Sequence, residues 1–346
     1  MKEKTHSFER IINGSEEDKQ VASDTLQEIY DSKSGSFEGY ELEKTPEDLE
    51  TIRIVESLVD KKVSECGGKV KSVPIDHIFI LKLGSIQKIT NGRLVGGIHQ
   101  PMGSKIGVER GESQLLFASS IAHELFHSKS YKAARIGKSA DDIRLYRSGI
   151  QMYDMKNPDD KYGEEKSYFG EMEEAIVAEC TRKLLNELSK EYILKEETEA
   201  VNILTGWMTG YYRHMGIPED QINMFEMELK YIPNAQSRVK QVIAFSDDEK
   251  KRQAYAAGMF EALYKQKRVE MVERYRERTK LYKILDKLLV DSGGMFKNRE
   301  EIFNVFAKAN FTGNYLPLAR IIEKILGKGS FRKLAEEFSE QVEKII

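Results

Sequence analysis

The chain has 346 residues, of which 40% are hydrophobic and 32% are charged; this balance indicates an ordinary soluble globular protein and excludes a disordered or membrane-embedded one. The formal net charge of −3 gives no indication of a nucleic-acid partner. The first residues lack the apolar core of a signal peptide, and no stretch approaches a membrane span. Cys66 and Cys180 form no disulfide framework, so we expect a cytoplasmic protein with reduced thiols.

The N-terminal third of the chain predicts two helices followed by short strands. Residues 1–45 are polar, with one helical pattern over residues 16–30. Thr45 has the form of a helix cap, and Pro46 and two acidic residues follow it, so a helix is expected from residue 46 to about Cys66. Strand-like runs come next, at residues 77–83, 94–98 and 105–109.

The most informative segment is the helical pattern at residues 115–128, which contains a His-Glu-x-x-His motif. This segment has no Pro or Gly, and Glu124 is its only charged residue, so it predicts a largely buried helix. His123 and His127 are four residues apart and therefore lie on one helical face, where both imidazoles can bind one Zn²⁺. Glu124 falls beside that metal, where a carboxylate can act as general base on a water molecule.

A catalytic zinc site needs a third protein ligand, and the next helical pattern offers carboxylates for it. This pattern begins at residue 171 and runs to about residue 192. Its helical phase places Glu173 and Glu174 on or beside the apolar face, whereas Glu171 and Glu179 fall on the solvated face. A carboxylate that faces the core requires a partner, so Glu173 and Glu174 are the candidates.

These two motifs resemble those of the gluzincin clan of zinc metallopeptidases, which have a thermolysin-like arrangement of the site. In that clan a glutamate in an Asn-Glu-Ala-like context completes a site of two histidines and one glutamate. The segment Glu174-Ala175-Ile176 is similar to that context, so the resemblance implies Glu174 as the third ligand, with Glu173 as the second choice. It also implies a small mixed sheet against the motif helix, with residues 96–100 or 104–108 as the edge that aligns a peptide substrate.

The sequence departs from this family at three positions. Glu173 stands where an asparagine is expected, Ala178 stands where an acidic residue should orient a ligand, and Lys129 replaces an apolar residue. Residues 159–163 are similar to the Asp-x-x-Tyr-Gly signature of zinc peptidases that use an aspartate ligand, and an acidic turn is the alternative interpretation.

The resemblance further implies a tyrosine and a histidine that stabilise the oxyanion. Tyr211, Tyr212 and His214 are the candidates, of which Tyr211 and His214 are preferred. Their alternative role is packing near the C-terminus of a helix that contains the only tryptophan, Trp207. After residue 179 the pattern is almost wholly helical, and Pro233 marks the best boundary before a C-terminal helical region.

The sequence therefore predicts an α+β protein with a polar N-terminal segment (1–45), a zincin-like metallopeptidase domain (46–232) and a helical C-terminal region (233–346). The expected cofactor is Zn²⁺ and the expected partner is a peptide or protein substrate, with no nucleic acid and no membrane. Two alternatives remain: a catalytically degenerate zincin scaffold that binds or regulates, and a helical interaction protein with a structural metal site. Glu124 argues against both, since a structural site has no use for a general base.

Overall fold

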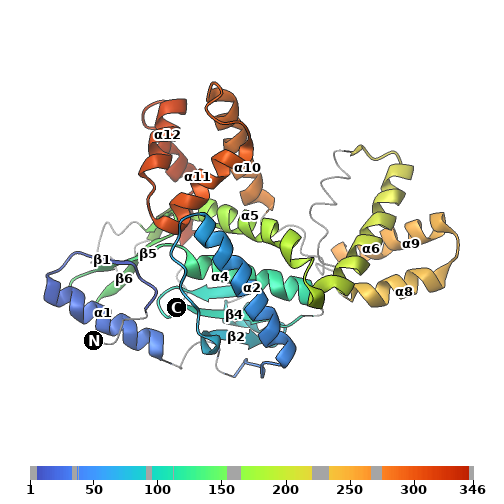
Figure 1. The fold of residues 1–346 in the computed structure, drawn as a ribbon, viewed down its shortest axis with the longest axis horizontal. Helices are drawn as coiled ribbons and strands as arrows, with labels where there is room; N and C mark the ends of the chain where they lie inside the picture. Colours follow the sequence, from blue (N-terminus) through green and yellow to red (C-terminus); the bar gives the residue numbers. More distant parts are fainter. Residues whose placement is uncertain are drawn as a thin grey trace.

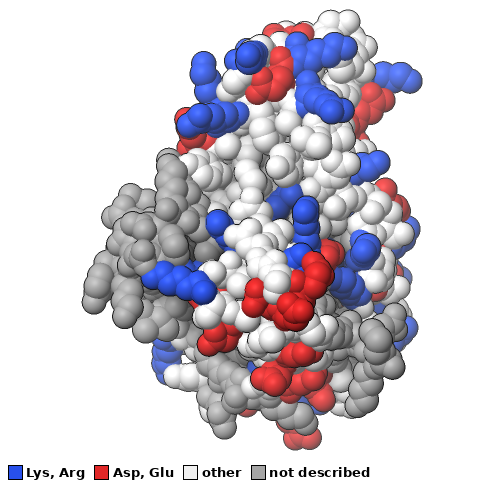
Figure 2. All heavy atoms as spheres, turned by 90° about the vertical axis from the view of Figure 1, so that its left-hand side faces the viewer, with Lys and Arg blue, Asp and Glu red and all other residues white. Residues whose placement is uncertain are grey.

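The computed structural model describes residues 6–32, 37, 39–90, 96–111, 113–153, 165–219, 234–265 and 275–342. In these residues the protein is α+β, with two small sheets among many helices (Figure 1). None of the described helices combines the length and the hydropathy that crossing a bilayer requires. On the face shown in Figure 2, acidic and basic side chains lie next to one another.

The strands are β1 (Arg10–Ile12), β2 (Ile78–Leu81), β3 (Gly97–Gln100), β4 (Lys105–Glu109), β5 (Lys132–Ile136), β6 (Ile143–Ser148), β7 (Gln151–Tyr153), β8 (Glu165–Tyr168) and β9 (Glu340–Val342). The helices of the N-terminal half are α1 (Glu16–Asp31), α2 (Pro46–Glu65), α3 (Ser85–Ile89) and α4 (Gln114–Lys129). Those that follow are α5 (Gly170–Leu188), α6 (Lys195–His214), α8 (Ala235–Phe245), α9 (Glu249–Lys265), α10 (Tyr275–Asp291), α11 (Arg299–Thr312), α12 (Leu316–Leu326) and α13 (Ser330–Glu337). Short 3₁₀ turns cover Ile75–His77 and Tyr192–Leu194.

The predicted helices at the N-terminus are confirmed, and their caps explain where they begin. Helix α2 starts after Thr45, whose hydroxyl accepts from the backbone N–H of Asp48, while the Asp48 carboxylate accepts from the backbone N–H of Thr45. This reciprocal pair satisfies two of the donors that a helix start leaves unpaired. Helix α1 begins in the same way, with Ser15 and Asp18.

The smaller sheet has the strand order β2-β4-β3, with β2 parallel and β3 antiparallel to β4. The predicted strand at 105–109 is thus the central strand, and the segment at 97–100 is an edge strand. Ile106 and Val108 on β4 are fully buried, and they belong to the same hydrophobic cluster as the inner face of α4. The sheet therefore covers α4 with its edge strand β3 alongside the helix.

The larger sheet has the order β1-β5-β6-β7-β8-β9, and its strands are antiparallel except for the β1–β5 pair. Sequence analysis predicted none of its strands. Both ends of the described chain belong to this sheet, with β1 at one edge and β9 at the other.

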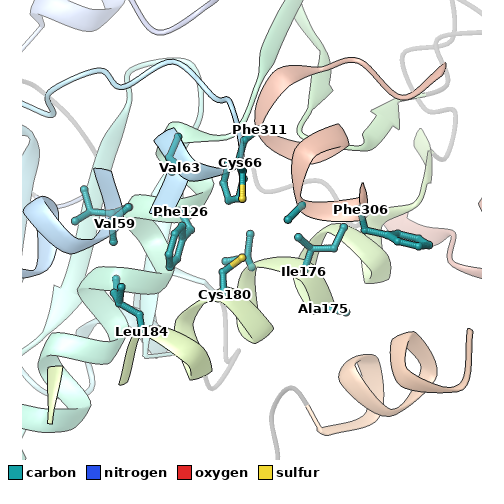
Figure 3. Close-up of a cluster of buried hydrophobic side chains, with 14 of the residues drawn as sticks. Val59, Val63, Cys66, Phe126, Ala175, Ile176, Cys180, Leu184, Phe306 and Phe311 are labelled. Carbon is teal, nitrogen blue, oxygen red and sulfur yellow. The ribbon is translucent and has the colours of Figure 1, made fainter. Parts of the chain in front are cut away.

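The main hydrophobic core lies where α2, α4, α5 and α11 meet (Figure 3). Phe126 on α4, Ile176 on α5 and Phe306 on α11 are each fully or almost fully buried there. Cys66 and Cys180 belong to this core as buried free thiols, as the sequence predicts, and burial raises the pKa of both. Close packing of this kind fixes α4 and α5 relative to each other.

The predicted solvated face of α5 is in fact covered by α10. Glu179 is only 3% exposed, and it is bound by Arg182 of its own helix and by the Tyr282 hydroxyl of α10. Glu171 pairs with Lys280, also on α10. The expectation that Glu171 and Glu179 face water is therefore wrong, because cationic and phenolic partners on α10 satisfy both carboxylates.

The hydrophobic clusters do not divide at the predicted boundary between residues 232 and 233. Helices α10 to α13 contribute to the main core, whereas α6, α8 and α9 share a cluster of their own. In Figure 1 these three helices lie together at one end of the molecule, beyond the end of α5. The C-terminal helices α10 to α13 are thus part of the body that carries α4 and α5.

Asn310 on α11 joins this C-terminal bundle to the end of α4. Its side chain is fully buried, donates to the Ser130 hydroxyl at 2.9 Å and accepts from the backbone N–H of Ile150 at 2.9 Å. Gly149 makes room for it, because a Cβ there would lie 2.0 Å from the Asn310 Oδ1 atom, and its φ of +55° also favours glycine.

We predict that Asn310→Ala lowers the free energy of unfolding by roughly 2–4 kcal/mol, because it leaves the buried N–H of Ile150 without its acceptor and removes one of the two hydrogen bonds of the Ser130 hydroxyl. Urea denaturation monitored by circular dichroism measures this. Asn314→Ala, on an exposed side chain four residues away, is the matched control and should change it little. Equal effects of the two substitutions would contradict the assigned role.

Candidate metal centre

The two histidines of the motif lie on one face of α4, as predicted. Their side chains are 13% and 12% exposed, and the Nε2 atoms of His123 and His127 are 3.0 Å apart. Helix α4 is otherwise buried along most of its length, so these imidazoles form a polar site on an apolar helix. Two adjacent imidazole nitrogens of this kind need a shared partner.

Glu174 of α5 completes a group that could hold a metal ion. Its Oε2 lies 3.6 Å from Nε2 of His123, and its Oε1 lies 3.5 Å from Nε2 of His127. One ligand atom from each of the three residues lies within 4.8 Å of the others. Metal–ligand bonds of about 2.0–2.2 Å in a tetrahedral arrangement place the ligand atoms about 3.3 Å apart. The observed separations of 3.0, 3.5 and 3.6 Å are close to that value.

Glu173 takes a different position from its neighbour. It is only 2% exposed, and its Oε1 lies 3.0 Å from Nδ1 of His127. A carboxylate on Nδ1 fixes the orientation of an imidazole and leaves Nε2 free to bind a metal. Glu173 therefore orients His127, which is the role that the family resemblance assigned to an acid at the position of Ala178. Helical phase alone could not separate Glu173 from Glu174, because both lie beside the apolar face.

Glu124 lies between α4 and the edge strand. Its side chain is almost fully buried, and Gly97 of β3 packs directly against it. A Cβ at position 97 would lie 2.7 Å from both Cγ and Oε1 of Glu124, so the absence of a side chain at Gly97 lets the strand come this close. The Glu124 carboxylate is thus held against the edge strand β3.

His99 and Lys132 are neighbours of the site that sequence analysis did not identify. The ring of His99 lies parallel to that of His127, with centroids 6.5 Å apart and an interplanar angle of 4°. Its Nε2 is 3.2 Å from Nζ of Lys132, which also donates to the backbone oxygen of Ser128 at 2.8 Å. The alternation of β3 could have indicated His99, because positions 97 and 99 of a strand lie on the same face.

Lys132 is fully buried, and this changes its titration. Burial lowers its pKa from 10.5 to about 7, although the carboxylates of Glu9 and Glu173 act in the opposite direction. Burial also lowers the pKa of His99 well below its ordinary value, and the neighbouring Lys132 adds to that shift. His99 is therefore a neutral imidazole.

Lys129, the unexpected residue after the motif, binds carboxylates of α2. It is 3% exposed, and its Nζ lies 3.2 Å from Glu56 and 2.6 Å from Asp60. A buried ammonium group is tolerated when it is paired in this way. Lys129, which stands where the resemblance leads us to expect an apolar residue, therefore connects α4 to α2. It leaves the imidazoles undisturbed.

The other predicted site residues belong to α6 or to the segment at 159–163. Tyr211 and Tyr212 of α6 pack against the cluster that α6 shares with α8 and α9, and His214 is exposed at the end of α6. Among the described residues, the group that could hold a metal ion consists of His123, His127 and Glu174. A role of Tyr211 and His214 at an oxyanion stays a prediction. The segment at 159–163 lies outside the described residues.

The beginnings of both helices are held by other parts of the chain. Glu197 of α6 accepts from the backbone N–H of Leu115 at 3.0 Å and from the Ser113 hydroxyl, so it caps α4. Helix α5 follows Phe169, which has a left-handed φ of +63°, and its first turn donates to the backbone oxygen of Phe338. These contacts set where the ligands of each helix lie.

Comparisons of the chain with protein-family models, with curated proteins and with solved structures found no match. The site is therefore interpreted from its own residues.

We predict that the buried amine of Lys132 makes stability depend on pH. Its pKa is lower in the folded protein than in the unfolded chain, so between pH 7 and 10.5 the unfolded state binds more protons and stability rises with pH. The unfolding free energy of wild type minus that of Lys132→Met should therefore rise between pH 6.5 and 9.5, by about 1 kcal/mol or more. Urea titrations measure it. A difference that stays constant, like that of the exposed control Lys82→Met, would contradict the assignment.

Proposed function

We propose that this protein is a zinc-dependent metallopeptidase of the gluzincin type. The observation that carries the proposal is the meeting of Nε2 of His123, Nε2 of His127 and the Glu174 carboxylate at separations of 3.0–3.6 Å, with Glu124 on the same helix. Three protein ligands with one position left open are typical of catalytic zinc sites, whereas structural sites use four.

The donor set favours zinc over the hard divalent cations. Imidazole nitrogen suits Zn²⁺ and other transition metals, while Mg²⁺ and Ca²⁺ take oxygen ligands almost exclusively. When bound at such a site, Zn²⁺ lowers the pKa of a water molecule to about 7 and polarises a carbonyl oxygen.

The chain's own residues supply the remaining roles. Glu124 would accept a proton from the attacking water and pass it to the amine nitrogen that leaves when the peptide bond breaks. Glu173 would hold His127 in one orientation through Nδ1. Because the Glu124 side chain is buried against Gly97, its carboxylate would be shielded from bulk water, which strengthens its interactions with a bound substrate.

Strand β3 supports a peptide as the class of substrate. Among the described strands β3 pairs only with β4, so the backbone of an extended chain would add along its other edge, beside Gly97 and His99. Addition of a peptide as a further strand is a general mode of binding, in which main-chain hydrogen bonds give affinity. An extended peptide on this edge would run past Gly97, next to Glu124.

The first test is metal content and cleavage. We expect purified protein to hold about one zinc ion per chain by plasma mass spectrometry and to cleave casein or a peptide library. Glu124→Gln should keep the zinc and lose at least about 100-fold in cleavage rate, because the general base is removed. Glu17→Gln, on an exposed glutamate of α1, is the matched control and should match wild type. Protein without zinc would contradict the proposal, and zinc without cleavage of any substrate would favour a degenerate scaffold.

The second test separates the two neighbouring glutamates. Glu174→Ala removes a ligand and should abolish stoichiometric zinc binding. Glu173→Ala removes only the partner of His127 Nδ1 and should weaken zinc affinity about 10- to 100-fold. Competition with a chromogenic chelator measures both affinities. Loss of zinc in Glu173→Ala but not in Glu174→Ala would show that Glu173, and not Glu174, is the third ligand.

A further inference from the structure

His99 of the edge strand β3 lies between two neighbours. Its ring faces His127 of the metal centre, and its Nε2 contacts the buried amine of Lys132. Its ring lies parallel to that of His127, and it projects from the same face of β3 as Gly97, which touches Glu124. It is therefore at the border between the metal-binding group and the strand edge. A substrate lying along β3 would pass this ring.

The contact with Lys132 defines which nitrogen of His99 carries the proton. Nε2 of His99 lies 3.2 Å from Nζ of Lys132, and the same Nζ donates to the backbone oxygen of Ser128. Below pH 7 Lys132 carries an ammonium group, which has donors and no acceptor, so Nε2 of His99 must accept at this distance. The ring proton then resides on Nδ1. No described residue accepts a hydrogen bond from Nδ1.

We propose that His99 binds the substrate: its Nδ1–H donates a hydrogen bond to a backbone carbonyl oxygen of a peptide aligned on β3, and Lys132 is the positioning residue that holds His99 in this tautomer. This inference rests on the proposed peptidase function. The edge strand would then bind substrate through a side-chain donor in addition to its backbone groups. The role of the buried Lys132 would be to fix the tautomer of that donor.

A purely structural role for His99 predicts a different pattern of substitutions. If the ring were only a packing element, Phe would replace it. If only the contact with Lys132 mattered, Gln would replace it, because the end of its side chain reaches the position of Nε2. If donation from Nδ1 matters, Asn is the conservative variant, because its amide nitrogen occupies the position of Nδ1 and also donates.

The test compares His99→Asn, His99→Gln and His99→Phe in steady-state cleavage of the casein-derived peptide that wild type cleaves fastest. Zinc content and thermal unfolding are measured for each variant. We expect His99→Gln and His99→Phe to raise KM about 10-fold with little change in kcat, because a hydrogen bond of ordinary strength to the bound substrate is lost. His99→Asn should stay within about threefold of wild type. Removal of a merely structural residue would not give this order.

A second measurement reads the tautomer directly and needs no turnover. In ¹⁵N-labelled wild type at pH 6, two-dimensional imidazole spectra should show His99 as the Nδ1–H tautomer. With six histidines in the chain, its signals are identified by their absence from His99→Phe. In Lys132→Met the preference for Nδ1–H should be lost.

The outcomes separate this inference from the function on which it rests. If wild type binds zinc and cleaves peptides, but Gln preserves KM better than Asn or the tautomer is Nε2–H, the role of His99 is wrong and the peptidase function stands. If wild type cleaves no peptide, both proposals are overturned. Loss of zinc in all three variants would make His99 part of the metal centre and would also overturn its assignment to the substrate.

Discussion

The site depends on one contact between helices, in which two adjacent glutamates of α5 reach opposite nitrogens of one imidazole of α4. Glu173 lies 3.0 Å from Nδ1 of His127, and Glu174 lies 3.5 Å from its Nε2. Adjacent residues on a helix point in directions about 100° apart, so both contacts form only when α5 crosses α4 at one height and one rotation. Once that crossing is fixed, His123 lies within reach of Glu174 as well.

Bringing buried carboxylates to this crossing costs free energy, and the surrounding structure offsets that cost. Tyr282 and Lys280 on α10 pair with Glu179 and Glu171 of α5, so the C-terminal bundle also contacts the polar residues of this helix. Glu197 of α6 caps the start of α4 by accepting a hydrogen bond from the backbone N–H of Leu115. The helices that carry His123, His127 and Glu174 are thus held by polar contacts with α6 and α10.

Local pattern was sufficient for the parts of the site that lie on one helix. The spacing of His123 and His127, the cap of α2 and the strand-like runs at 77–83 and 105–109 could all be predicted, because each depends on residues close in sequence. Contacts between distant elements could not. The partners of Glu179 and the pairing of His99 with Lys132 arise from packing of α10 and β5 that no period reveals. The larger sheet was missed because it pairs segments far apart in the sequence, and its edge strands β1 and β9 have only three residues each, too few to show a period.

Zinc-edge anomalous diffraction from crystals of the zinc-loaded protein tests the central claim most directly. The account predicts one strong peak about 2.0–2.2 Å from Nε2 of His123, Nε2 of His127 and a Glu174 oxygen, with Glu173 on Nδ1 of His127 and no fourth protein ligand. A peak at any other place, a peak bound by Glu173 in place of Glu174, or the absence of a peak between α4 and α5 would contradict it.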